Sequence, residues 1–163
     1  MCGILFVFSK KGRPLNKKKC NEAKNSLKGR GPDKILSNFF FNEQVYICNS
    51  ILGIEGKIKK GVDLYSTKDK NNFISYNGEI YNYLSLSDEK NDNDTNFLIK
   101  FISNLKNYKE LTKLDGMYSF VHLDKKKKII TFASDPQGEK RLYKFENKEF
   151  LIIASTPKAI LTF

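Results

Sequence analysis

The chain begins Met1-Cys2-Gly3-Ile4, so a cysteine stands directly after the initiator methionine. Cysteine is small enough for this methionine to be removed, which would leave a thiol and a free α-amine on one residue. An α-amine has a pKa of about 7.7–8.0 and a free thiol about 8.5, so the amine is a base near neutrality beside a nucleophile that it can deprotonate. One interpretation of this pattern is that Cys2 is a catalytic nucleophile, although these residues alone favour a structural role. The alternative interpretation is a buried cysteine that opens an N-terminal strand.

A second pattern that could do chemistry is Asn77-Gly78-Glu79, which follows the β-rich run Phe73–Tyr76. Asn-Gly between two such runs is a strong hairpin signal, and the structural interpretation is a type I′ turn. The functional interpretation is that the Gly78 backbone N–H and the Asn77 carboxamide converge on one point, as the donors of an oxyanion hole do. The residues alone leave both interpretations open.

Two further segments carry charged side chains at predicted helix ends. Asp94 opens the clearest helical pattern of the chain, whose apolar stripe over residues 97–105 is wide enough to pack on a sheet. Its carboxylate is expected to cap that helix, which would not prevent it from meeting a ligand. Arg30-Gly31-Pro32-Asp33 is expected to be a compact turn that stops the preceding helix, because Pro32 pushes Gly31 out of the helical region.

The elements that must position these residues are mostly strands. Residues 2–9 contain an unbroken apolar run typical of a buried strand, and residues 16–29 predict an amphipathic helix with Asn16 as its N-cap. Two β-rich runs on either side of residues 42–44 predict a hairpin. Further strands are expected at 114–124, 129–133, 142–143 and 150–153, a helix from Pro157, and loops over most of 53–72 and 87–93. Many strands with amphipathic helices predict an α+β domain of antiparallel sheets covered by helices.

The composition limits the class of protein. With 163 residues, of which 40% are hydrophobic, the chain is long enough for one folded domain and too short for two ordinary ones. No apolar run approaches the roughly 18 residues that cross a membrane, and the N-terminus has no signal-peptide pattern. The three cysteines are scattered, and with a single histidine, His122, they give neither a disulfide framework nor a zinc pattern. We therefore expect a reduced, cytoplasmic protein without a metal or a cofactor.

The formal net charge of +11 raises the hypothesis of a nucleic-acid partner. The lysines lie in short clusters at predicted loops and helix faces, and no helix-turn-helix, zinc-finger or ribonucleoprotein-type aromatic motif accompanies them. The charge is therefore a weak signal for nucleic acid, and a basic docking face for another protein explains it equally well.

Five motifs follow one another in an order that resembles a known family: MCGI at 1–4, RGPD at 30–33, YNGEIYN at 76–82, LDGMYSF at 114–120 and ASDPQGEKRLY at 133–143. Over essentially its whole length, the chain resembles the glutaminase (class II glutamine amidotransferase) domain of the asparagine synthetase family. The resemblance implies an N-terminal-nucleophile hydrolase fold over residues 1–163, of the α+β class, with two stacked antiparallel sheets in four αββα layers.

The resemblance also implies a reaction, the hydrolysis of the glutamine side-chain amide to glutamate and ammonia. Once the initiator methionine is removed, Cys2 would attack the side-chain carbonyl and form a thioester, which water then hydrolyses. Asn77 and the backbone N–H of Gly78 would be the oxyanion donors. Glu79 and Asp94 would bind the α-ammonium group of L-glutamine.

One position departs from the family. Where the family usually has an Arg-Leu-Ser-Ile segment, whose arginine grips the α-carboxylate of glutamine, this chain has Ser50 and Ile51, followed by Leu-Gly-Ile. A hydrogen bond to a charged group contributes about 1.5–3 kcal/mol, so its loss predicts glutamine binding weaker by roughly ten- to a hundred-fold. Arg30 and Arg141 are candidates to replace the arginine. Three outcomes stay open: weak glutamine binding, another amide as substrate, or a catalytically silent domain that serves partner binding or regulation.

In the family, a synthetase domain with an ATP-binding Ser-Gly-Gly loop follows the glutaminase domain, and this motif is absent from the 163 residues. The liberated ammonia would then have no built-in acceptor. We therefore expect a separate synthetase subunit as a partner, with the lysine-rich surface as a docking face, and neither a membrane nor a nucleic acid as a partner.

Overall fold

Two antiparallel sheets, each with helices on one face, make up the computed structural model, which describes residues 1–53, 64–87 and 93–163. The chain divides into two compact units, the first made of Met1–Leu64 and Arg141–Phe163 and the second of Tyr65–Lys140. The predicted α+β class with antiparallel sheets is confirmed. The loops expected at 53–72 and 87–93 lie partly outside the described residues.

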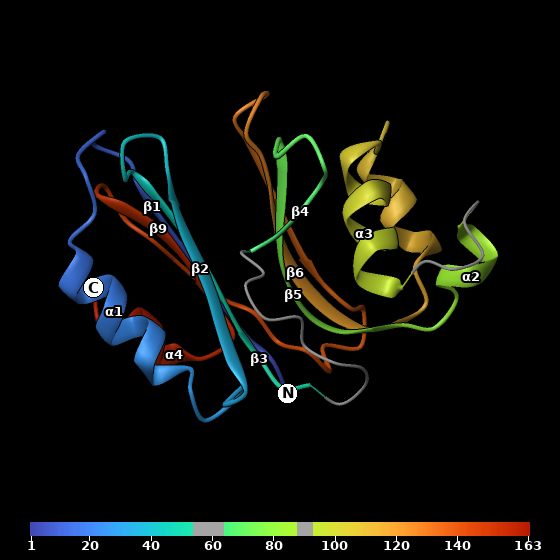
Figure 1. Cartoon of the computed structure of the whole chain (residues 1–163), viewed down its shortest axis with the longest axis horizontal. Coiled ribbons are helices and arrows are strands. Elements are labelled where there is room, and N and C mark those ends of the chain that lie inside the picture. The colour runs from blue at the N-terminus through green and yellow to red at the C-terminus, as the bar shows by residue number, and fades with distance from the viewer. Residues whose placement is uncertain (54–63, 88–92) are drawn as a thin grey trace. The chain divides into compact units, whose positions relative to one another are not determined.

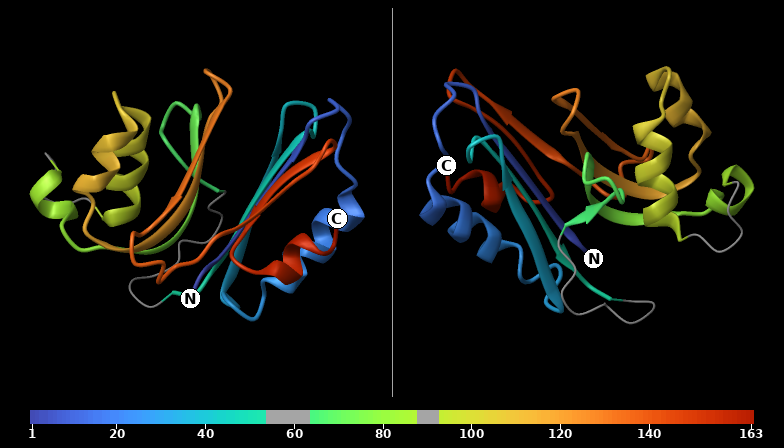
Figure 2. Two further views of the ribbon diagram at one scale, coloured as in Figure 1. Left: turned by 180° about the vertical axis from the view of Figure 1, so that it is seen from behind. Right: turned by 45° about the horizontal axis from the view of Figure 1, so that its top comes forward.

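The first unit contains a five-stranded sheet in the order β2-β3-β1-β9-β8, in which all neighbours are antiparallel. Helices α1 and α4 lie side by side on one face of this sheet (Figure 1, Figure 2). The elements are β1 (Gly3–Ser9), α1 (Lys17–Ser26), β2 (Lys34–Phe40), β3 (Val45–Ile51), β8 (Tyr143–Glu146), β9 (Phe150–Ala154) and α4 (Pro157–Ile160).

Strand β1 lies between β3 and β9 and is buried on both faces, which explains its unbroken apolar sequence. Leu5 and Val7 point to the helix side, where they share one cluster with Cys20 of α1. Ile4 and Phe6 alternate with them and are fully buried on the opposite face. The N-terminal residues are therefore joined to a rigid, central strand.

The helix and the hairpin expected after β1 are both present. Helix α1 begins where predicted, because the Asn16 side chain accepts hydrogen bonds from two backbone N–H groups of the first turn. The helix ends at Ser26 rather than near Gly29, because from Leu27 on the backbone N–H groups bond to carbonyls three residues back, which tightens residues 27–30 into turns. Strands β2 and β3 form the predicted hairpin.

The second unit contains a four-stranded sheet in the order β4-β5-β6-β7, with α3 packed on β5 and β6 (Figure 1). The predicted helical stripe is confirmed, since Phe97, Leu98 and Ile102 are buried in one cluster with Ile74 and Phe120 of the sheet. The elements are β4 (Tyr65–Ser66), β5 (Asn72–Ile80), α2 (Tyr83–Leu86), α3 (Asp94–Ser103), the 3-10 helix η1 (Tyr108–Lys113), β6 (Gly116–Asp124) and β7 (Ile129–Ser134).

Candidate functional site

The residues predicted for the site are divided between the two units. The first unit contains Cys2, Ser50 and Ile51, and the second contains Asn77, Gly78, Glu79 and Asp94. The structure thus groups them into one set at the start of β1 and a second set along β5 and at the start of α3.

Cys2 lies directly before β1 and is half-buried. Its backbone carbonyl accepts a hydrogen bond of 3.1 Å from Arg30 Nε, and its thiol lies 3.9 Å from the carbonyl oxygen of Leu52. Met1, which precedes it, is 54% exposed, as its removal by a processing enzyme requires. The guanidinium group of Arg30 therefore holds the backbone of the predicted nucleophile while the N-terminus stays accessible.

The RGPD segment follows the turn after α1 and packs against the end of β3 beside Cys2. Gly31 packs so closely on β3 that a Cβ there would collide with the backbone of Ser50 and lie 2.5 Å from the Ile51 nitrogen. The Asp33 carboxylate accepts a hydrogen bond of 2.8 Å from the backbone N–H of Gly53. The segment thus packs against β3 at Gly31 and is bonded at Asp33 to the last residue of β3, through a hydrogen bond of 3.1 Å from the Asp33 N–H to the Ile51 carbonyl.

Ser50 and Ile51, which are predicted to stand where the family has Arg-Leu, point to opposite faces of the first sheet. Ser50 is fully buried, and its hydroxyl donates a hydrogen bond of 3.0 Å to the carbonyl of Leu27 on the α1 side. Gly3 pairs with Ser50 across β1 and β3, and a Cβ at Gly3 would lie 2.5 Å from the Ser50 hydroxyl oxygen. This corner is closely packed, and the role of both residues in substrate binding stays a prediction.

Asn77-Gly78-Glu79 is not a turn, so the predicted type I′ hairpin is wrong. The three residues lie within β5, which continues to Ile80 and pairs with β6 over its whole length. Gly78 has a φ of 141°, and a Cβ there would collide with the carbonyl oxygen of Met117 on β6. The Asn-Gly pair therefore serves the close approach of two strands, which only glycine permits, rather than a reversal of the chain.

The strand pairing decides where the backbone N–H of Gly78 points. Gly78 stands opposite Tyr118, whose carbonyl accepts a hydrogen bond of 2.7 Å from the backbone N–H of Asp135, on the far side of β6. In an antiparallel ladder, the N–H and C=O of one residue point to the same side of the strand. Since the Tyr118 carbonyl points away from β5, Gly78 and Tyr118 form a non-hydrogen-bonded pair. The Gly78 N–H thus points away from β6, to the side on which Ile80 N–H meets the Asp94 carboxylate at 3.4 Å.

That side of β5 is open at Gly78 in the described part of the chain. Strand β4 pairs with β5 only at Phe73 and Ile74, and no other described strand lies on that side. The Gly78 N–H is therefore placed at a sheet edge, between the end of β4 and Asp94, where it can donate to a ligand.

Asn77 contributes a buried amide without a partner. The residue is 3% exposed, and its Nδ2 has no hydrogen-bond acceptor among the described residues. A buried donor that is left unpaired costs about 1–3 kcal/mol, so such an atom needs an explanation in the function of the protein or in bound solvent. Asn77 Nδ2 and the N–H of the next residue, Gly78, are together the two donors predicted for an oxyanion.

Asp94 is the first residue of α3 and not its N-cap, so the predicted capping role is wrong. The cap is Asn93, whose side chain accepts a hydrogen bond of 2.8 Å from the backbone N–H of Asn96. The Asp94 carboxylate instead accepts a hydrogen bond of 2.7 Å from the Tyr76 hydroxyl. Tyr76 belongs to the YNGEIYN motif but was not predicted as a site residue, because nothing in its local sequence indicates a contact with residue 94.

Two other residues of that motif have different surroundings. Glu79 is exposed and lies on the same face of β5 as Asn77, so its predicted contact with the substrate stays a prediction. Asn82 donates to the Lys113 carbonyl at 2.8 Å and accepts from the Asp115 backbone N–H at 3.0 Å. Asn82 thereby fastens the segment after β5 to the segment before β6, which is a structural role that the motif did not reveal.

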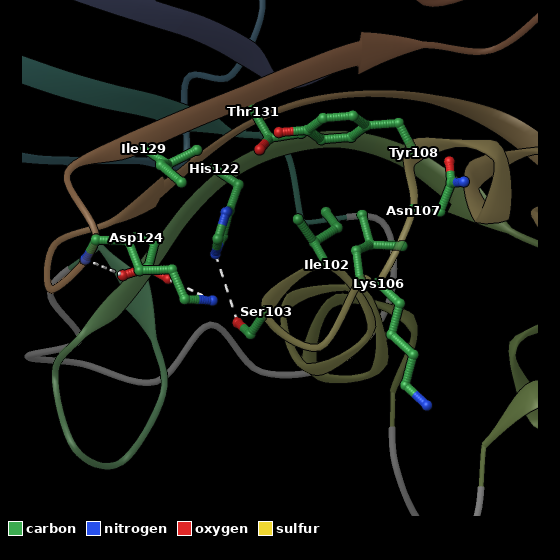
Figure 3. Close-up of a pocket in the computed structure, with 11 residues that line it drawn as sticks. Ile102, Ser103, Lys106, Asn107, Tyr108, His122, Asp124, Ile129 and Thr131 are labelled. Carbon is green, nitrogen blue, oxygen red and sulfur yellow. Dashed lines mark hydrogen bonds and ion pairs between the residues drawn. The ribbon is translucent and has the colours of Figure 1, made fainter.

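A hollow of about 180 Å³ lies at the C-terminal end of α3, and none of the predicted site residues lines it (Figure 3). His122 of β6 points from the sheet toward Ser103 of α3, with its Nε2 at 3.5 Å from the Ser103 hydroxyl and at 3.1 Å from Asn72 Oδ1. Burial lowers the pKa of His122 to about 4, so the ring is neutral at pH 7. The single histidine is thus a buried part of the second unit, away from the predicted catalytic residues in the sequence and on the α3 side of its sheet.

Comparisons with known proteins agree with the five motifs. A family profile described as a glutamine amidotransferase domain matches residues 1–163. Asparagine synthetase [glutamine-hydrolyzing] 1 of Bacillus subtilis is 30% identical over 176 residues, which cover 99% of this chain and 27% of that protein. A putative asparagine synthetase [glutamine-hydrolyzing] 2 of Methanocaldococcus jannaschii is 30% identical over 99% of this chain and 35% of that protein.

Asparagine synthetase [glutamine-hydrolyzing] of Zea mays is 34% identical over 88% of this chain and 25% of its own length. The chain thus spans about a quarter to a third of the length of these relatives. None of the described helices is long and apolar enough to cross a membrane. From the profile match and the identities, the chain belongs to the glutamine amidotransferase domain family.

Proposed function

We propose that this chain hydrolyses the side-chain amide of L-glutamine to glutamate and ammonia, with Cys2 as the nucleophile. Three relatives carry the words glutamine-hydrolyzing in their names, and the profile match includes the N-terminal Met-Cys-Gly start. After removal of Met1, the α-amine of Cys2 takes the thiol proton. The thiolate then attacks the side-chain carbonyl carbon of glutamine and forms a tetrahedral intermediate with a negatively charged oxygen.

The observation that carries the proposal is the Asn77 amide, which is unpaired among the described residues, next to the Gly78 N–H, which faces no other described strand. Both donors suit the oxyanion of the intermediate, and one such donor lowers a barrier by about 2.7–4 kcal/mol. Collapse of the intermediate breaks the carbon–nitrogen bond, and the α-ammonium of Cys2 returns its proton to the leaving ammonia. Water then hydrolyses the thioester, which releases glutamate and restores the thiol.

Substrate binding in this proposal depends on Asp94 and Glu79, whose carboxylates pair with the α-ammonium group of glutamine. At the carboxylate end, Ser50 replaces the expected arginine. Arg30 uses its Nε on the carbonyl of Cys2, and Arg141 is exposed on the surface of the first unit. Binding of the α-carboxylate is therefore weaker in this proposal than with an arginine fork.

The product ammonia serves an amide-forming synthetase in this proposal. The relatives named asparagine synthetase are three to four times longer than the matched region, so the acceptor reaction belongs to sequence beyond it. A separate synthetase subunit is the corresponding partner of this chain, and a reducing cytoplasmic compartment keeps the thiol of Cys2 free.

The test measures ammonia release from glutamine by protein that mass spectrometry shows to lack Met1. We expect turnover by the wild-type protein and none by Cys2→Ala. Absence of ammonia release from wild-type protein without Met1 would overturn the proposal. It would favour instead a catalytically silent glutaminase-like domain that binds a partner, for which the missing arginine at Ser50 is the supporting observation.

A further inference from the structure

We infer that Tyr76 is a positioning residue for the substrate, because its hydroxyl holds the carboxylate of Asp94. The inference rests on the proposed function, in which Asp94 binds the α-ammonium group of glutamine. Tyr76 lies in the middle of β5, is 7% exposed, and donates a hydrogen bond of 2.7 Å to Asp94 Oδ2. A buried tyrosine hydroxyl needs a partner, and here that partner is a carboxylate of the predicted site.

The two oxygens of the Asp94 carboxylate are used differently. Oδ2 accepts from the Tyr76 hydroxyl at 2.7 Å and from the Ile80 backbone N–H at 3.4 Å. Oδ1 meets only the Thr95 hydroxyl among the contacts in the described residues, at a long 3.4 Å. A carboxylate offers about four lone-pair positions, so the geometry points to Oδ1 as the oxygen that is left for an ammonium group.

Tyr76 also ties Asp94 to the strand that carries the oxyanion donors. Tyr76 and Asn77 are consecutive in β5, and their side chains point to opposite faces of the sheet. The Tyr76 ring is buried in the cluster that joins β5 to α3, and its hydroxyl reaches the first residue of that helix. One rigid strand therefore places the donors for the amide end of glutamine and, through Tyr76, the carboxylate for its ammonium end.

This arrangement predicts a specific kinetic effect. In Tyr76→Phe the ring and its packing remain, but Asp94 loses its shortest hydrogen bond. Because the Asp94 carboxylate is then held less firmly, we expect KM for glutamine to rise about ten-fold or more, with kcat changed by less than about two-fold. Tyr83→Phe is the matched control, since Tyr83 packs against Phe97 of α3 in the same cluster, and we expect its KM to stay at the wild-type value.

A double-mutant cycle with Asp94→Asn separates positioning from a general structural role. If Tyr76 acts through Asp94, adding Tyr76→Phe to Asp94→Asn causes no further rise in KM. The same holds for the monoamide of glutaric acid, which is glutamine without its α-amino group: wild type and Tyr76→Phe should hydrolyse it equally. Equal losses on both substrates, or additive effects in the cycle, would overturn the inference and assign Tyr76 to folding alone.

Binding of glutamine to Cys2→Ala protein, measured by calorimetry, keeps the two proposals apart. Hydrolysis by wild type with an unchanged KM in Tyr76→Phe would overturn the positioning role and leave the glutaminase activity standing. If Cys2→Ala protein binds glutamine about ten-fold more weakly after Tyr76→Phe, and wild type does not hydrolyse glutamine, positioning would be supported and the activity overturned. A protein that neither binds nor hydrolyses glutamine would overturn both.

Discussion

The surroundings of Cys2 and of Asn77 differ in how their polar groups are used. Beside Cys2, the side chains bond to the protein itself: Arg30 Nε donates to the Cys2 carbonyl, and Asn49 Nδ2 donates to the Gly3 carbonyl at 3.1 Å. In the second unit, Asn77 Nδ2 has no acceptor in the described part of the chain. The side chains of Arg30 and Asn49 thus hold the backbone at Cys2 and Gly3 in place. The side chain of Asn77 instead has a donor that no described residue uses.

Asn49 and Asn77 make this difference clear, because both are almost fully buried, at 1% and 3% exposure. Asn49 lies in β3 between two neighbouring strands, whereas Asn77 lies in a part of β5 that pairs only with β6 in the described structure. A buried amide that is bonded contributes to stability, and one that is unbonded lowers it. Because the unpaired Asn77 Nδ2 belongs to the residue before Gly78, whose N–H lies at the sheet edge, we assign its missing acceptor in the described structure to a ligand.

The largest expected effect is that of Asn77→Ala on catalysis. Loss of an oxyanion donor should lower kcat by about 10²–10³-fold, or 2.7–4 kcal/mol of barrier. The free energy of unfolding should not fall through a lost hydrogen bond, because Nδ2 makes none in the described structure and its removal relieves a buried unpaired donor. Ammonia release and urea denaturation of the same preparation measure the two quantities.

Asn49→Ala is the matched control, and its effect should be the opposite. It removes the hydrogen bond that Asn49 Nδ2 donates to the Gly3 carbonyl, so we expect a loss of about 0.5–1.5 kcal/mol in the free energy of unfolding. Equal stability losses in both variants would contradict the comparison, since Asn77 would then be bonded in solution.

A second expected effect concerns stability and pH, and it tests whether every unpaired polar atom in the second unit is functional. His122 Nδ1 is also without a partner among the described residues. Burial lowers the pKa of His122 to about 4, below the value of about 6.5 in unfolded chains. Between these two values the unfolded state binds more protons, so stability rises with pH. His122 therefore contributes about 3 kcal/mol to the free energy of unfolding above pH 6.5, and this contribution is lost as pH falls toward 4.

Urea denaturation at pH 7 and at pH 4.5 measures this loss, with His122→Asn as the control. The carboxylates titrate in both proteins, so the difference between the two pH profiles isolates His122. We expect a flatter profile for His122→Asn between pH 6.5 and 4.5. Identical profiles would show that His122 is hydrated, and its unpaired atom would then not distinguish it from a surface histidine.

Local patterns in the sequence predicted the elements well. The apolar run of residues 2–9, the cap at Asn16 and the helical stripe of α3 depend on neighbours within a few positions, and all three are confirmed. The order of the five motifs predicted the family, which the profile match over residues 1–163 confirms.

The details of the site depend on pairing between distant segments, which no local pattern contains. Asn77-Gly78 was predicted as a turn because the Asn-Gly signal does not reveal that β5 pairs with β6 as far as Ile80. Likewise, the face to which Ser50 points follows from its register with Gly3. The contact of Tyr76 with Asp94, 18 positions away, needs α3 packed on β5.

The smallest expected effect tests the frame around Cys2 through two glycines of the same turn. A Cβ at Gly31 would collide with the backbone of Ser50, whereas a Cβ at Gly29 meets no described atom within 4 Å. Neither glycine has a positive φ, so backbone strain does not separate them. Gly31→Ala should therefore lower the free energy of unfolding by about 1–3 kcal/mol, and Gly29→Ala should change it by less than about 0.5 kcal/mol.

Gly31→Ala should also lower ammonia release, because the methyl group displaces the end of β3 against which Cys2 is held. Urea denaturation and the glutaminase assay, run on both variants, measure the two effects. If Gly31→Ala were as stable and as active as Gly29→Ala, the frame would have room to adjust. The residues around Cys2 would then not form a rigid set. The observation that Asn77 Nδ2 has no acceptor among the described residues does not depend on this test.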